Sequence, residues 1–311
     1  MAETSFARHG VAPRVVSPVA RPRREPTPVV GGSATGRADL AALVRVGGRR
    51  AGQMCTEHVS RFERDKRRPS LLRRVFGAGP LSDGEREAFD AARGERLVGA
   101  ELDKLSPSWI VLHSLPAPGA SGDLDHVVVG PAGLFAITTR YVDGERVFVA
   151  DDYLLTSGLR TPFAREAIAA ARRTAQLAGR TLPPSVSARP VLAIAGARAV
   201  RVGVRARAVD VRDAAVVRSW LESQPVVLDA YTVERVGARV AAAFEESSRV
   251  DLASDSTSAA ASETRFRRLE REIAAARRIR SLWRVVGACA VTAGVWVAFA
   301  HLPSWLALHV G

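Results

Sequence analysis

The apolar and polar positions first become regular near residue 82, which predicts that the folded region begins there. Ser82 and Asp83 are good helix caps, and apolar residues then recur at helical spacing to about Leu105. Apolar runs separated by turn residues follow, and they predict an antiparallel meander. Its strands are expected at residues 109–115, 126–129, 134–140 and 145–150.

A second helix and a buried strand are expected after the meander. Pro162 suits the first turn of a helix and Gly179 suits a C-terminal cap, so the alanine-rich segment between them is predicted to be helical. Residues 190–195 form a short apolar run that is typical of a buried strand. A further strand and two helices are expected at residues 206–211, 213–221 and 233–246. The order α-β-β-β-α-β followed by helices predicts an α/β sandwich around a mixed sheet.

The first 80 residues are predicted to be a disordered basic arm. Residues 1–50 are rich in proline, glycine, alanine and arginine, with no sustained period. Residues 61–74 carry seven basic residues around Pro69. This cluster is either a solvated charge run or a phosphate-binding patch. In the second case, contacts with nucleic acid are expected at Arg67, Arg68, Arg73 and Arg74.

The folded region, residues 81–247, is followed by a predicted linker and a basic helix. Residues 248–263 are rich in serine, alanine and aspartate, as flexible linkers are. Residues 264–284 are strongly basic and contain apolar residues at three- and four-residue steps. These apolar residues are Phe266, Leu269, Ile273 and Ala276. Two interpretations are open: the helix lies along anionic lipid headgroups, or its apolar stripe is the seam of a homodimer.

The last apolar run predicts a transmembrane helix. Residues 285–310 contain no Asp, Glu, Lys or Arg over 26 positions, enough to cross a hydrocarbon core of ~30 Å. Trp283 and Trp305 bracket the run, as interfacial aromatic residues do. Several arginines precede it and no basic residue follows it. The positive-inside rule therefore predicts a single-pass protein of the cell membrane, with its N-terminal bulk in the cytoplasm.

Charge and cysteine content narrow the classes of function. The formal net charge is +13 with only two lysines, so nearly all the basic residues are arginines. This excess fits either an arginine-rich codon usage or attraction to phosphate on DNA, RNA or lipid. Cys55 and Cys289 form no disulfide framework and no zinc-site spacing, which fits a reducing environment. No motif for a small-molecule substrate or an organic cofactor is evident.

Residues 93–200, about a third of the chain, resemble the nuclease-related domain (NERD), a branch of the restriction-endonuclease-like superfamily. The most specific block is Asp123-Leu124-Asp125-His126-Val127-Val128-Val129-Gly130-Pro131, and Gly133-Leu134-Phe135-Ala136-Ile137 follows it. Weaker matches are Gly94-Glu95, Trp109-Ile110-Val111-Leu112 and Thr161-Pro162. The resemblance implies a restriction-endonuclease-like αβββαβ fold and a site for phosphodiester hydrolysis.

Such hydrolysis uses Mg²⁺, which prefers carboxylate oxygens as ligands. Asp125 is the expected first carboxylate and Glu95 a supporting one. By resemblance, Thr138 occupies the position of the family's second acid and Arg140 that of its lysine. These two residues lie two apart on a strand and so share a face.

These replacements argue against catalysis. Threonine supplies no charge to a metal, and arginine keeps its proton at any working pH. Arg165 also replaces a glutamine that is frequent in the family. We therefore expect a site without Mg²⁺, in which Arg140 pairs with Asp125, and we interpret His126 as a structural histidine. An active enzyme would need a displaced acid, at Asp123, Asp143 or Glu145.

Overall fold

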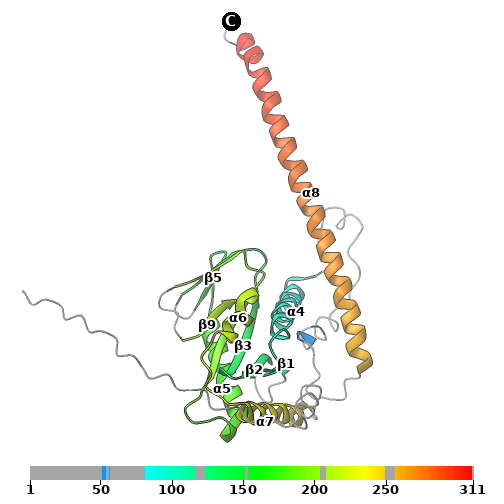
Figure 1. The fold of residues 1–311 in the computed structure, drawn as a ribbon. Helices are drawn as coiled ribbons and strands as arrows, with labels where there is room; N and C mark the ends of the chain where they lie inside the picture. The colour runs from blue at the N-terminus through cyan, green and yellow to red at the C-terminus, as the bar shows by residue number, and fades with distance from the viewer. Residues whose placement is uncertain are drawn as a thin grey trace, which may run out of the picture.

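A five-stranded mixed sheet in the order β1-β2-β3-β7-β9 forms the centre of the fold (Figure 1). Its strands are β1 (Ile110–Leu115), β2 (Leu124–Gly130), β3 (Gly133–Tyr141), β7 (Ala188–Ala195) and β9 (Asp210–Asp213). Strands β1, β2 and β3 form an antiparallel meander, whereas β3, β7 and β9 run parallel. The computed structural model describes residues 51–53, 56, 81–115, 123–150, 153–203, 208–248 and 256–309.

Helices cover both faces of this sheet. Helix α4 (Asp83–Leu102) and the short helix α6 (Val217–Glu222) pack on one face, together with the 3-10 turn η2 (Ala214–Val216). Helices α5 (Phe163–Ala178) and α7 (Ala230–Ser248) pack on the other, and the 3-10 turn η1 (Gly179–Thr181) follows α5. The predicted α/β sandwich around a mixed sheet is confirmed.

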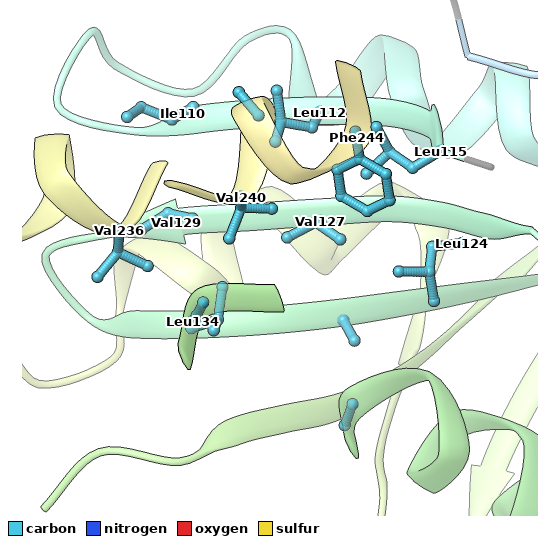
Figure 2. Packing of buried hydrophobic residues seen from close by; sticks show 14 of the residues in the cluster. Ile110, Leu112, Leu115, Leu124, Val127, Val129, Leu134, Val236, Val240 and Phe244 are labelled. Atoms are coloured by element: carbon cyan, nitrogen blue, oxygen red, sulfur yellow. The ribbon is translucent and has the colours of Figure 1, made fainter. Parts of the chain in front are cut away.

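The core on the α7 side illustrates why these segments associate. Val127 and Val129 of β2 have no exposed surface and meet Val236 and Val240 of α7 (Figure 2). The aromatic ring of Phe244 closes the same cluster from α7. Each fully buried aliphatic side chain of this size stabilises the fold by about 1.5–3 kcal/mol. The continuous apolar run in β2 is thus explained by burial of both faces of the strand.

The predicted helix ends agree with the structure to within a few residues. The backbone N–H and hydroxyl of Ser82 both donate to the carboxylate of Glu85, at 2.7 Å, so Ser82 caps α4. Pro162 directly precedes α5, and Gly179 follows it with φ +55°. Helix α4 ends at Leu102, three residues before the expected end.

The fourth expected strand does not belong to the meander. Strand β4 (Arg146–Val149) pairs with β5 (Leu154–Thr156) and β8 (Ala199–Val202), and β5 pairs with β6 (Leu159–Thr161). These strands form a separate four-stranded sheet in the order β6-β5-β4-β8. The chain leaves the central sheet at the turn that contains Gly144, where φ is +72° and glycine is favoured.

Helix α8 (Ser256–His309) is one continuous helix, which changes two expectations. Residues 256–263 are helical rather than linker. The apolar stripe of the basic helix packs on α4 of the same chain, where Phe266 stacks on Phe89 with ring centroids 4.8 Å apart. Ion pairs of Arg96 with Glu263, at 2.7 Å, and of Arg277 with Asp143, at 2.8 Å, flank this contact. The stripe is therefore neither a lipid-facing surface nor a dimer seam.

The C-terminal half of α8 leaves the folded region and extends away from it (Figure 1). Within Ala260–Phe299 it is long and apolar enough to cross a membrane, and its apolar stretch is not covered by the rest of the protein. Trp296 and Phe299, for example, are each 75% exposed. A core helix of a soluble protein would bury such residues, so α8 is a candidate membrane span.

Part of the predicted N-terminal arm packs on α4. The backbone of Gly52 lies so close to Ala92 that a Cβ atom would come within 2.8 Å of its carbonyl oxygen, and Thr56 is buried. The expectation of disorder throughout residues 1–80 is therefore wrong at these positions. Outside the described residues lie Arg67, Arg68, Arg73 and Arg74.

Candidate nuclease-like site

One cavity of about 680 Å³ brings together the four residues that the sequence singled out. Glu95 enters it from α4, Asp125 from β2, and Thr138 and Arg140 from β3. Helix α5 lines the remaining side of the cavity. Because side chains alternate along a strand, Thr138 and Arg140 point to the same face, as the spacing predicted. The constellation inferred from the resemblance is thus a real spatial cluster.

Asp125 is held in place by the neighbouring strand. Its Oδ2 atom accepts a hydrogen bond of 2.6 Å from the backbone N–H of Thr139. Burial of the carboxyl and, to a smaller extent, the nearby Glu95 carboxylate raise the pKa of Asp125 from 3.8 to about 7. The hydrogen bond from Thr139 and the charge of Arg140 oppose this rise in pKa without cancelling it. Asp125 is therefore partly protonated at neutral pH.

Glu95 is almost fully buried, at 6% exposure, and lies beside a strained residue. The hydroxyl of Ser114 donates to its Oε2 atom at 3.3 Å. Ser114 has φ +47°, in the left-handed region that non-glycine residues rarely adopt. Such strain costs on the order of 1–3 kcal/mol and concentrates at functional sites. This backbone distortion places a hydroxyl at the cavity next to the buried carboxylate.

Arg140 does not bind as expected. Its guanidinium forms an ion pair with Glu166 of α5, and its Nη1 atom donates to the backbone oxygen of Thr139 at 3.1 Å. The predicted direct pair with Asp125 is therefore replaced by a bridge between β3 and α5. The charge of Arg140 still lowers the pKa of Asp125 through space.

Glu166 is the functional residue that sequence reasoning missed. It lies in the first turn of α5, where an acidic side chain is favoured by the helix dipole. The local sequence carried no signal that it would meet Arg140, because that pairing depends on how α5 crosses β3. Two more arginines of α5 also line the cavity, Arg165 and Arg173.

The side chains at the cavity do not fit a magnesium ion. Among the described residues, no group of three or more His, Cys, Asp and Glu side chains is arranged to hold a metal. Thr138 offers a neutral oxygen, and Arg140 brings a permanent positive charge. Of the displaced acids considered, Asp123 lines the cavity, but Asp143 pairs with Arg277. The backbone oxygen of Glu145 accepts from Arg198 beside the second sheet.

His126 is only half satisfied, contrary to our interpretation. Its Nδ1 atom lies 2.8 Å from Nδ1 of His113, and Nε2 of His113 lies 3.0 Å from Oδ1 of Asp103. Burial and the neighbouring His113 hold the pKa of His126 well below 6.5. Its Nε2 atom is buried without a hydrogen-bond partner among the residues described, and His126 lines the cavity.

Comparison with known proteins agrees with the geometry. Residues 90–195 match the family model described as the nuclease-related domain, NERD. Searches of curated proteins and of solved structures returned no match. The matched span runs from within α4 to the end of β7, and it contains Glu95, Asp125, Thr138, Arg140 and Glu166. The chain therefore carries a nuclease-related (NERD) domain at residues 90–195, followed by a C-terminal helix that is a candidate membrane span.

Proposed function

We propose that this protein is a membrane-tethered NERD domain that no longer hydrolyses phosphodiesters and instead binds nucleic-acid phosphate with arginine. The observation that carries the proposal is the bridge from Arg140 to Glu166, which places a guanidinium at the position of the family's lysine. The proposal has two parts, the loss of catalysis and the retention of binding.

Loss of catalysis follows from the chemistry of the four side chains. A phosphodiesterase of this type needs carboxylates that are ionised and free to hold Mg²⁺. Asp125 has a pKa near 7, so a large fraction of it is protonated at neutral pH. Arg140 cannot accept a proton from water, and it already binds the nearest acid on α5. The site therefore lacks both a metal cage and the lysine that the family's enzymes place beside the attacking water.

Retention of binding rests on the three arginines at the cavity. Arg140, Arg165 and Arg173 all line it, and a guanidinium group binds phosphate through two parallel hydrogen bonds. The ion pair between Arg140 and Glu166 is largely exposed, with 38% and 51% of the side chains accessible. Exposed pairs of this kind are worth only ~0.2–1 kcal/mol. An incoming phosphate can thus replace Glu166 as the partner of Arg140 at little cost.

A second candidate function is a Mg²⁺-dependent nuclease with a migrated acid. Glu166 and Asp123 bring two carboxylates to the cavity beyond Asp125 and Glu95, and this observation favours it. The permanent positive charge of Arg140 beside these carboxylates weighs against it, because it repels a metal cation. A third alternative is a scaffold that binds no nucleic acid, in which the arginines serve only lipid and protein contacts.

Removing two cavity arginines should weaken binding and flatten its salt dependence. The full-length protein in phosphatidylcholine nanodiscs is titrated into fluorescein-labelled DNA and RNA oligonucleotides, with EDTA present, and anisotropy is followed over a range of salt. Each phosphate contact contributes about one to the slope of log K against log salt. The double variant Arg165→Gln/Arg173→Gln should therefore lose about two from that slope.

The matched control removes the same charge from positions outside the cavity. Arg172 and Arg180 are exposed and do not line it, so Arg172→Gln/Arg180→Gln should keep most of the slope. Equal losses in the two double variants, or no binding by the wild type, would favour the scaffold. Plasmid nicking in Mg²⁺ or Mn²⁺ that disappears in Asp125→Ala would instead establish the nuclease.

A further inference from the structure

The small sheet β6-β5-β4-β8 has one buried face and one exposed face. Its inner face carries Val147 and Val149 of β4 and Leu154 of β5, which pack on Phe163 and Ala167 of α5. On the outer face, no described residue covers Phe148 fully: it is 44% exposed and lies between the two buried valines. The sheet is thus amphipathic, and its outer face is accessible to a partner.

The register of the strands places a defined row of side chains on that outer face. Phe148 pairs with Arg201 of β8 on one side and with Leu155 of β5 on the other, and Leu155 pairs with Arg160 of β6. Residues in register project from the same face. Arg146, two residues before Phe148, projects from this face as well and is exposed. None of these four described strands contains an acidic residue.

Two observations place this sheet at the end of the domain that is nearer to the apolar part of α8. Asp143, at the turn into β4, pairs with Arg277 of α8 at 2.8 Å. Arg277 precedes the uncharged run that begins at Val285 by eight residues, or about 12 Å of helix. The end of the domain that carries β5 lies in the direction in which α8 rises, whereas α7 lies at the opposite end (Figure 1).

We propose that the outer face of this sheet, defined by Arg146, Phe148, Leu155, Arg160 and Arg201, docks on anionic lipid headgroups of the bilayer that α8 crosses. The contact of α8 with α4 fixes the domain relative to the helix, so the sheet reaches the headgroup region without a flexible tether. Arginines meet lipid phosphates, and the apolar side chains between them enter the interface. The inference rests on the membrane span and is independent of nucleic-acid binding.

The charge of the bilayer sets the strength of docking. A basic residue near an anionic surface contributes about a fivefold factor, so three arginines should raise the ratio of docked to undocked domain about a hundredfold. A zwitterionic bilayer lacks this attraction. The contrast between the two lipids is therefore the most direct signature of the proposed contact.

A spin label at Phe148 tests the proposal. Phe148 is exposed on the outer face of the sheet, so Phe148→Cys in a background with Cys55→Ser and Cys289→Ser accepts a nitroxide there. The full-length protein is placed in nanodiscs of phosphatidylcholine or of an equimolar mixture with phosphatidylglycerol. In the anionic discs the label should lose collisions with a water-soluble nickel chelate and gain collisions with oxygen. In phosphatidylcholine it should stay accessible to the chelate.

Two controls make the result specific. A label at Tyr231→Cys, exposed at the start of α7, should stay accessible to the chelate in both lipids. The variant Arg146→Gln/Arg160→Gln/Arg201→Gln should return the label at position 148 to water in anionic discs. Accessibility of this label to the chelate in anionic discs, or equal protection in both lipids, would overturn the proposal. Because the lipid comparison uses one protein, it tests the contact whether or not the triple variant folds.

Discussion

Replacing Asp125 by asparagine should stabilise the protein at neutral pH. An ionised carboxylate at this position is disfavoured by burial and by Glu95, which together raise its pKa to about 7. A rise from 3.8 to about 7 corresponds to at most about 4 kcal/mol of lost stability once the group is ionised. Asparagine has nearly the same shape, keeps an oxygen for the N–H of Thr139 and carries no charge, so it should recover much of this free energy.

The stability difference between wild type and Asp125→Asn should depend on pH in a defined direction. Below about pH 4 Asp125 is protonated in both the folded and the unfolded chain, so wild type and Asp125→Asn should be equally stable there. Between about pH 4 and pH 7 the unfolded chain ionises while the folded protein keeps its proton. The free energy of unfolding of the wild type therefore falls through this window relative to that of the variant. Above pH 7 the difference should be constant.

Urea unfolding of the full-length protein in detergent, followed by tryptophan fluorescence at several pH values, measures this difference. Asp229→Asn is the matched control, because a hydrogen bond from Thr232 lowers the pKa of that exposed carboxyl. It should bring no stabilisation at neutral pH. A gain in Asp125→Asn that is the same at every pH, or a loss at neutral pH, would show that the pKa of Asp125 is not raised in the folded protein.

Replacing Phe266 by alanine should detach α8 from the domain. Phe266 is 1% exposed, stacks on Phe89 and lies under the guanidinium of Arg96, 4.8 Å from the ring centre. Truncating a buried phenylalanine to alanine costs about 3–5 kcal/mol. The contact consists mainly of this residue and its neighbours Leu269 and Ile273, so such a loss should open it while the central sheet stays folded.

Hydrogen–deuterium exchange of the protein in nanodiscs resolves this local opening. In Phe266→Ala, the backbone amides of α4 near Phe89 and those of residues 260–277 of α8 should exchange faster with deuterium. The amides of β2 and β3 should keep their protection. Leu282→Ala, on the same helix but 63% exposed, should leave the pattern unchanged. Faster exchange throughout the central sheet, or no change near α4, would contradict this account of the contact.

The α8 contact also determines which fragment can be studied. A fragment that stops at residue 247 would expose Phe89 and Ala92, which are now almost fully covered. Such a fragment would present an apolar surface that the protein covers with its own helix. Functional assays therefore need the docked part of α8, up to about Arg277.

The central meander could be predicted because local signals and burial agree there. The continuous apolar run of Val127, Val128 and Val129 predicts a strand that is buried on both faces. The turn from Gly130 to Gly133 joins β2 directly to β3. The candidate site residues were inferred from the resemblance to the nuclease-related domain, and the period of the strand then places Thr138 and Arg140 on one face. The pairing of β2 with β3, which the tight turn between them fixes, then brings Asp125 next to these two residues.

What could not be predicted depends on contacts between distant segments. The second sheet is built from strands of three and four residues, too short to show a period. The stripe on α8 has the same spacing whether lipid, a second chain or α4 covers it, so Phe89 was not identifiable as its partner. Likewise, nothing in the local sequence indicated that Arg140 would form an ion pair with Glu166, since that pairing depends on how α5 crosses β3.

Calorimetric titration of the full-length protein with Mn²⁺ tests most directly whether the cavity has lost its metal. With Arg140 bridging to Glu166 and Asp125 partly protonated, we predict no saturable heat that depends on Asp125 at neutral pH. A stoichiometric binding isotherm that disappears in Asp125→Asn would contradict the account, because it would show that the cavity still binds a divalent metal through Asp125.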